Sequence, residues 1–229
     1  MARRTAGQQA TAYFTKRFRA CGTPERAKNE KAYMKSALRF FGARMPDVRG
    51  AAREYQLAIA PISHETLLDI ATTLFATDYH ELRNAAIALL ELEQKTLTTS
   101  DLPLLLSFVR EASNWAHVDW LAAKVIGPVV HRAPKPATLL RQWAKDEHMW
   151  IRRTALLASL DKLRIDGDFE LFEELATPML QEKVFWIRKA IGWVLREVSK
   201  KRPALVRGFI RRHRTKMSGL TLREASKYI

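Results

Sequence analysis

Residues 81–93 carry the pattern that decides the fold, and they read Glu81-Leu82-Arg83-Asn84-Ala85-Ala86-Ile87-Ala88-Leu89-Leu90-Glu91-Leu92-Glu93. Apolar residues recur in this stretch at spacings of three and four, which is typical of a helix with one buried face. The same pattern returns at residues 151–163 and 187–198. Strand-like alternation is absent, and prolines fall mostly between the helical segments. The sequence therefore predicts an all-α protein.

A two-residue phrase, an aliphatic residue followed in most copies by arginine, recurs along the chain. Its copies are Val48-Arg49, Leu82-Arg83, Val118-Asp119, Ile151-Arg152, Ile187-Arg188 and Leu222-Arg223. Subtraction of these numbers gives steps of 34, 36, 33, 36 and 35 residues, a period that belongs to stacked helical repeats such as HEAT, armadillo and TPR. We expect a right-handed superhelical solenoid of about six HEAT-like repeats, because a helix pair buries its apolar face only by stacking on its neighbours.

The spacing of small residues supports close packing between the expected helices. An alanine stands three residues after the aliphatic residue in four copies of the phrase: Ala51, Ala85, Ala190 and Ala225. No interdomain linker is evident. We therefore expect residues 1–229 to form a single HEAT-like-repeat domain, in which residues 1–8 are a mobile tail.

The charge of the chain points to a polyanionic partner. Lys and Arg number 39 against 24 Asp and Glu, which gives a net charge of +15 and a pI near 10.2. Nucleic acid is the first candidate for such a partner and an anionic membrane surface is the second. No apolar stretch approaches the roughly 18 residues that a membrane span needs, and no secretory signal is evident. These features favour a cytoplasmic protein.

Metal and disulfide chemistry find little support in the composition. The single cysteine, Cys21, excludes an internal disulfide and a cysteine-rich zinc site. Six scattered histidines form no metal motif, and we expect His117 and His148 to lie on the surface. We expect no metal and no cofactor.

Asp119 breaks the series of arginines in the repeated phrase. A carboxylate in a position otherwise held by cations suggests a chemical group placed where anionic DNA lies. Asp119 could also be a helix N-terminal charge stabilised by the helix dipole. Each phrase arginine could pair with an acidic residue of the next repeat or lie on a solvated face. Together with the net charge of +15, the arginines favour a basic concave groove, since solenoids present equivalent positions along one surface.

Several short motifs point to one known family. They are Trp115-x-x-x-Asp119, Trp150-x-x-Arg153, Ala32-Tyr33-Met34-Lys35, Leu222-Arg223-Glu224-Ala225 and, most specifically, Ala190-Ile191-Gly192-Trp193-Val194-Leu195-Arg196-Glu197. With these motifs the chain resembles, from about residue 10 to its end, the AlkD-type DNA alkylation repair enzymes. These are HEAT-like-repeat glycosylases that excise alkylated purines. The family motif commonly has two successive tryptophans before the aspartate, whereas this chain has Asn114 before Trp115, a departure that bears on substrate range.

The resemblance implies roles for individual residues. Asp119 looks like the catalytic carboxylate, and Trp115 and Trp193 look like the aromatics that flank the lesion nucleotide. Arg153 looks like the residue that holds the DNA backbone, and Tyr33 is similar to a tyrosine near the same cleft. We add to the DNA-binding set three further arginines: Arg152, Arg188 and Arg196.

The residues themselves leave other roles open. Trp115 and Trp193 could be core, and Arg153 could pair with Asp146. Four further tryptophans are expected to pack between repeats: Trp120, Trp143, Trp150 and Trp186. The basic stretch from Arg207 to Lys216 could be a solvated helix end or could reach the duplex backbone.

The leading functional prediction is a monofunctional DNA glycosylase. It would hydrolyse the N-glycosidic bond of N3- and N7-alkylated purines in double-stranded DNA and act as a monomer. The resemblance implies contact through the DNA backbone and sugar, with the lesion left stacked. The alternative is a non-catalytic HEAT-repeat protein that binds damaged or branched DNA. A protein-binding scaffold is the third possibility, and the net charge of +15 disfavours it.

Overall fold

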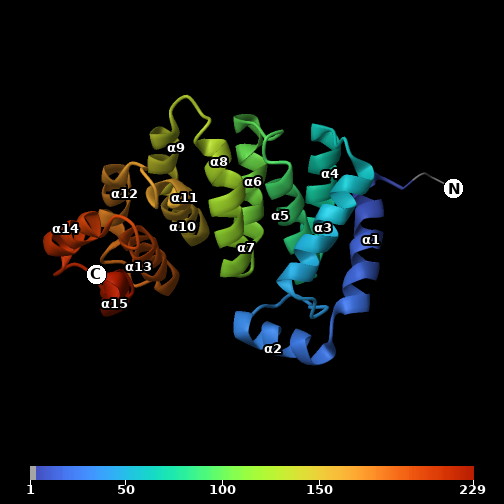
Figure 1. Cartoon of the computed structure of the whole chain (residues 1–229), viewed down its shortest axis with the longest axis horizontal. Coiled ribbons are helices and arrows are strands. Elements are labelled where there is room, and N and C mark those ends of the chain that lie inside the picture. Colours follow the sequence, from blue (N-terminus) through green and yellow to red (C-terminus); the bar gives the residue numbers. More distant parts are fainter. Residues whose placement is uncertain (1–3) are drawn as a thin grey trace. The chain divides into compact units, whose positions relative to one another are not determined.

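The computed structural model describes residues 4–229, and helices are the named secondary structure throughout that range (Figure 1). Extended pairing within it amounts to an isolated parallel bridge between Arg39 and Tyr79. The all-α prediction is confirmed. The described chain divides into two compact units whose segments alternate along the sequence. Unit 1 holds the described residues up to Asp101 together with Glu111–Trp120, and unit 2 holds Leu102–Arg110 and Leu121–Ile229.

Unit 1 is built from paired helices. Its helices are α1 (Ala6–Cys21), α2 (Pro24–Met34), α3 (Met45–Ile59), α4 (His64–Phe75), α5 (His80–Leu92), the short η1 (Thr99–Asp101) and α7 (Trp115–Trp120). Helix α1 packs on α4, and α3 packs on α5. Helix α2 has no buried residue and lies apart from this row, across the ends of its neighbours (Figure 1).

The start of α1 corrects one expectation. We expected residues 1–8 to be a mobile tail, but Thr5 forms a capping box with Gln8 and the helix begins at Ala6. The Gly7 N–H also donates to the Asp69 carboxylate at 2.8 Å. Local capping and this long-range bond fix residues 5–8, because both satisfy N–H groups that a helix start leaves free. Residues 1–3 of the expected tail lie outside the described part of the chain.

Unit 2 has two layers of helices. Its helices are α6 (Leu102–Glu111), the π-helical η2 (Leu121–Ile126), α8 (Gly127–Val130), α9 (Pro136–Trp143), α10 (Met149–Leu157), α11 (Leu160–Leu163), α12 (Phe169–Ala176), η3 (Thr177–Met179), α13 (Phe185–Ser199), α14 (Pro203–His213), α15 (Gly219–Ala225) and η4 (Ser226–Tyr228). Figure 1 shows α9, α12 and α14 in one layer and α10, α13 and α15 in the other. The two layers enclose the apolar core of this unit.

The repeated phrase marks one helix of each pair, as the sequence predicts. Its six copies lie on α3, α5, α7, α10, α13 and α15. The aliphatic residue is at most 2 % exposed in the first five copies, and all four alanines at the third following position are buried. Gly192 shows how close the helices come, since a Cβ there would stand 2.7 Å from the Glu224 Cβ on α15. The predicted right-handed superhelix and its concave groove would each extend over both units. Both features stay predictions.

Candidate functional site

Helix α7 carries Trp115 and Asp119 four residues apart, so both side chains project from one face of the helix. Both are half-buried. Asn114 caps the start of this helix: its side-chain oxygen accepts from the backbone N–H groups of Ala116 at 3.1 Å and His117 at 3.4 Å. The asparagine that departs from the family motif therefore has a local structural role.

The opposite face of α7 is anchored by a buried histidine pair. His117 is fully buried, its ring stacks on that of His80 at 4.6 Å, and its Nε2 lies 3.3 Å from the His80 carbonyl oxygen. Phe40 stacks on His80 at 4.5 Å. Burial lowers the pKa of His80 to about 4 and that of His117 well below its usual range, so both rings are neutral at pH 7. The expectation that His117 lies on the surface is wrong, because the ring fills a gap between aromatic side chains.

A second anchor holds the last residue of α7. The Trp120 Nε1–H donates to the Glu91 carboxylate at 2.6 Å. Arg49 pairs with the same carboxylate at 3.1 Å and lies over the Trp120 ring at 4.3 Å from its centroid. The predicted packing role of Trp120 is thereby confirmed, and α7 is fixed to both α3 and α5.

Tyr33 of α2 meets Trp115 edge to face, with ring centroids 6.1 Å apart. The Tyr33 side chain is 73 % exposed, so most of its ring is open to a ligand. The loop after α2 is held by a buried carboxylate, since Glu81 accepts from the backbone N–H groups of Phe41, Gly42 and Ala43. Burial raises the pKa of Glu81, and these three donors oppose the rise. Unit 1 therefore brings together the predicted site residues Tyr33, Trp115 and Asp119.

Three of the five phrase arginines share a structural contact. In three copies the guanidinium donates to the backbone carbonyl of the residue six positions earlier: Arg83 to Thr77 at 2.9 Å, Arg152 to Asp146 at 2.9 Å and Arg188 to Glu182 at 2.5 Å. Each bond ties the start of the helix to the loop that precedes it. We call this contact the loop tether. An aspartate cannot donate such a bond, so Asp119 stands at a position where three of the other repeats have a tether.

Additional contacts engage the same guanidinium groups. Arg83 also donates to the Glu111 carbonyl at 3.0 Å, and Arg152 pairs with the Glu182 carboxylate at 3.0 Å. The sequence predicted phosphate contacts for Arg152 and Arg188, and the structure shows both held by their own loops. Any charge that they present to DNA is therefore fixed in place.

Arg153 is a buried arginine in unit 2. The residue is only 2 % exposed. Its guanidinium donates to the Trp186 carbonyl and lies 5.8 Å from the centroid of the Trp186 ring. Asp146, a possible partner in the sequence, pairs instead with Arg110 at 2.7 Å. The Trp150 and Trp186 rings pack at 5.8 Å, which agrees with their predicted packing role.

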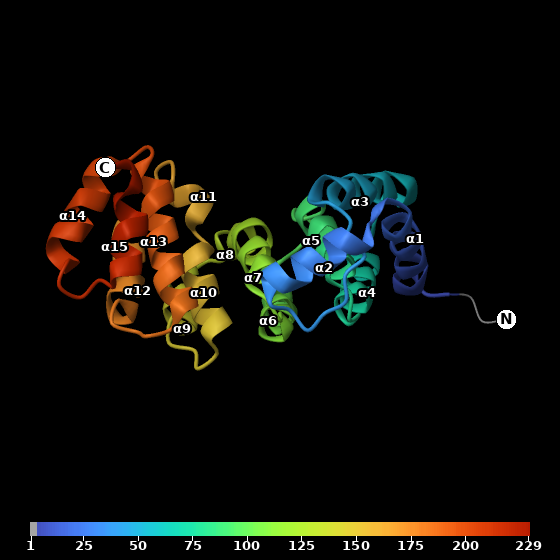
Figure 2. The same ribbon diagram turned by 90° about the horizontal axis from the view of Figure 1, so that it is seen from below.

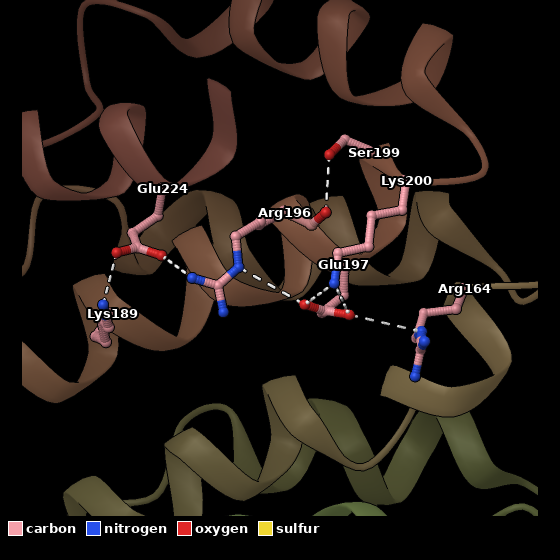
Figure 3. A network of polar contacts seen from close by, with 7 residues as sticks. All are labelled: Arg164, Lys189, Arg196, Glu197, Ser199, Lys200 and Glu224. Atoms are coloured by element: carbon pink, nitrogen blue, oxygen red, sulfur yellow. Dashed lines mark hydrogen bonds and ion pairs between the residues drawn. The ribbon is translucent and has the colours of Figure 1, made fainter. Parts of the chain in front are cut away.

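Trp193 lies half-buried on α13. Charged residues of the same helix form a network of ion pairs (Figure 3). Lys189 and Arg196, which neighbour Trp193 on the helix, both bind the Glu224 carboxylate of α15, the former at 2.6 Å. The hydrogen bond from Lys189 is the main cause that lowers the pKa of Glu224. Glu197 lies 3.6 Å from Arg196. The network fixes α13 against α15, and it shares the charge of Arg196 between two carboxylates.

Sequence reasoning missed the residues that position the site. Asn114, His80 and Glu81 have no motif that would mark them.

Within residues 4–229, no group of three or more His, Cys, Asp and Glu side chains could hold a metal ion. Over the same residues no helix has both the length and the apolar character needed to cross a membrane.

A helical, strongly basic protein with half-buried tryptophans and a carboxylate on a firmly anchored helix has the features of an all-α protein that binds nucleic acid. The particular family follows from sequence. The profile of the DNA alkylation repair enzyme family matches residues 14–229, and the chain belongs to that family.

Solved structures agree with this assignment. The chain is similar to a predicted DNA alkylation repair enzyme from Enterococcus faecalis, with a TM-score of 0.82 and 25 % identity over 91 % of this chain and 97 % of the other. AlkD2 from Streptococcus mutans shares the fold, with a TM-score of 0.63 and 19 % identity over 89 % and 99 % of the two chains. So does smu.31 from Streptococcus mutans UA159, with a TM-score of 0.61 and 18 % identity over 93 % and 99 %. No curated protein matches the chain.

Proposed function

We propose that this protein is a monofunctional DNA glycosylase that removes N3- and N7-alkylated purines from duplex DNA. The observation that carries the proposal is the setting of Asp119. This copy of the phrase has a carboxylate where the other five copies have arginine, and three contacts hold its helix: the Asn114 cap, the His117–His80 stack and the Trp120–Glu91 bond. A carboxylate at a position where every other copy of the phrase has arginine, on a helix this firmly held, suits chemistry.

The proposed chemistry needs no strong general acid. Alkylation at N3 or N7 makes the purine cationic and hence a good leaving group. As the glycosidic bond breaks, the deoxyribose acquires positive charge, which the Asp119 carboxylate stabilises while it orients a water for attack. The faces of Trp115 and Trp193 would each favour a cation, by about 0.5–2 kcal/mol per contact. No metal, nucleotide cofactor or lysine nucleophile takes part in this scheme.

The proposed DNA-binding residues differ in what they contribute. Tyr33 offers an exposed ring beside Trp115. Arg152 and Arg188 are half-buried, are fixed by backbone carbonyls and would attract phosphate as immobile charges. Arg153 is only 2 % exposed and is held by the Trp186 carbonyl, so it would act on phosphate through its charge and not through a wide contact. We expect Arg196 to contribute least, because its charge is shared with Glu224 and Glu197.

The test is release of methylated purines from alkylated duplex DNA by the purified protein. Asp119→Asn keeps the shape of the side chain but removes its charge, so we expect base release to fall about 100-fold or more, with duplex affinity and helical content unchanged. Asp166→Asn, an exposed carboxylate in unit 2, is the matched control and should excise normally. Undiminished release by Asp119→Asn would refute the assignment of Asp119, and no release by the parent would favour a protein that binds damaged or branched DNA without chemistry.

A further inference from the structure

The positive charge of the chain is concentrated in one segment. Residues 198–223 contain no Asp or Glu and nine cations: Lys200, Lys201, Arg202, Arg207, Arg211, Arg212, Arg214, Lys216 and Arg223. The rest of the chain has 30 cations (39 minus nine) against 24 acids, so this segment supplies nine of the net fifteen positive charges. None of the residues assigned above to the glycosylase site lies within it.

Some of these cations have structural partners. Lys200 pairs with Glu197, Arg202 donates to the carbonyls of Leu163 and Gly167, and Arg212 pairs with Glu173 of α12 at 2.6 Å. The others are exposed and have no carboxylate within ion-pair distance among the described residues: Lys201, Arg207, Arg211, Arg214, Lys216 and Arg223. Each of these six charges is therefore available to an external anion.

Three of the six form a row on one helix. Arg207, Arg211 and Arg214 are spaced by four and three residues, which places them on one face of α14 and the turn that follows it. We call this row the α14 stripe. The other face of α14 buries Val206 and Phe209, and the Phe209 ring packs on those of Phe169 and Phe172 in α12. Figure 2 shows α14 at the end of unit 2, with its outer side uncovered by any other element of that unit.

The spacing of the stripe suits a phosphate backbone. At a rise of about 1.5 Å per residue, the stripe spans about 10 Å. One strand of B-DNA presents a phosphate per about 3.4 Å of helix axis, hence about three phosphates over that length. The guanidinium fork is also the side chain best matched to phosphate oxygens.

Other polyanionic partners fit the stripe less well. Firm binding of a helix to an anionic membrane combines charge with apolar side chains that insert among the lipids. The apolar face of α14 is buried against α12, so only the charges would attract a membrane. An acidic protein would need an apolar or aromatic anchor at the centre of the interface. The three residues of the stripe are arginines. Its neighbour Ala204 is too small for an anchor, and its neighbour Ile210 is only partly exposed.

We propose that the α14 stripe binds the phosphate backbone of duplex DNA without regard to the lesion. The stripe belongs to the α9–α12–α14 layer of unit 2, whereas Trp193 and the phrase arginines of that unit belong to the α10–α13–α15 layer. It therefore forms a second DNA contact, which keeps the protein on undamaged DNA. This proposal rests on the proposed function only in taking DNA as the substrate.

The experiment compares two variants that each lose three exposed charges. One is Arg207→Gln/Arg211→Gln/Arg214→Gln. The matched control is Lys16→Gln/Arg19→Gln/Lys95→Gln, in unit 1, whose cations are likewise exposed. Affinity for an undamaged duplex is measured by fluorescence anisotropy over a series of salt concentrations. We expect the stripe variant to flatten the slope of log affinity against log salt by about 2.7, or about 0.9 for each phosphate contact, and the control to flatten it by less than about 1.

The outcomes separate this proposal from the glycosylase. A stripe variant with the slope of the parent, or one changed no more than the control, overturns the proposal. A membrane result would also overturn it: the parent binds vesicles of phosphatidylcholine and phosphatidylglycerol more tightly than it binds the duplex, and the stripe variant loses this vesicle binding. Single-turnover base release at saturating protein should stay parental in the stripe variant, because the stripe contains no residue of the glycosylase site. If the parent releases no base at all, the proposed function fails, and the salt slopes still decide the role of the stripe.

Discussion

Asp119 illustrates, at the scale of single residues, how a functional group is supported by neighbours that no motif reveals. Its helix is capped by Asn114 and packed on the buried pair His80 and His117. The sequence identifies Asp119 because an aspartate interrupts a series of arginines, and that signal needs no structure. It could not identify the support, since a histidine in an apolar setting looks the same in sequence whether it is buried or exposed.

The buried histidines predict how stability depends on pH. Burial lowers the pKa of His80 from 6.5 to about 4 in the folded protein, so the unfolded chain binds the proton more tightly. Stability is therefore unaffected by this histidine above pH 6.5, and it decreases as the pH falls from 6.5 toward 4, because protonation favours the unfolded chain. Between pH 7 and pH 5 this single group should cost about 2 kcal/mol of the free energy of unfolding.

The measurement is chemical unfolding of the parent and of His80→Gln at both pH values. The variant should be less stable than the parent at pH 7, and its loss of stability on going to pH 5 should be smaller by about 2 kcal/mol. Equal losses in the two proteins would mean that His80 is not the group that titrates.

At the scale of helices and loops, the repeated phrase encodes a local bond in three of its six copies. The period and the helices that it marks were predictable, because an apolar residue every 33 to 36 positions must be buried if the pairs stack. The purpose of the arginine was not predictable in the same way. An arginine that lines a groove and an arginine that donates to a carbonyl six residues earlier look the same in the sequence. Only the hydrogen bonds of the structure distinguish the two roles.

The loop tether gives a prediction with a matched pair of variants. Arg188→Gln removes the donor to the Glu182 carbonyl and should lower the free energy of unfolding by about 1–2 kcal/mol, since the carbonyl loses a charged partner. Arg223→Gln changes the same phrase position on α15, where the side chain is exposed, and should cost less than about 0.5 kcal/mol. Thermal or urea unfolding measures both. Equal costs would show that the tether does not stabilise the fold.

The whole molecule combines predictable and unpredictable features. The net charge and the helical period pointed to a nucleic-acid-binding protein of stacked helices, and the family assignment over residues 14–229 agrees. The division into two units with interleaved segments was not visible, because chain composition changes little at the boundaries. The partners of the cations were also hidden. Many arginines are neutralised locally, so the count of 39 cations overstates the charge available to DNA.

The last prediction follows from that available charge. A protein that neutralises about 5–8 phosphates should show a slope of log affinity against log salt of about −4.5 to −7. We expect an undamaged duplex and a duplex with one alkylated purine to give the same slope, because the phosphates contacted are the same. The lesion should appear as a constant offset in affinity, since the groups that sense the cationic base, Trp115, Trp193 and Asp119, release no counterions from the backbone. The measurement is a pair of salt titrations with Asp119→Asn, which allows binding without excision. A slope near zero would exclude a phosphate-binding surface and favour a protein-binding scaffold. A steeper slope for the damaged duplex would mean that recognition of the lesion recruits further phosphate contacts, and the separation between positioning and sensing residues would then be wrong.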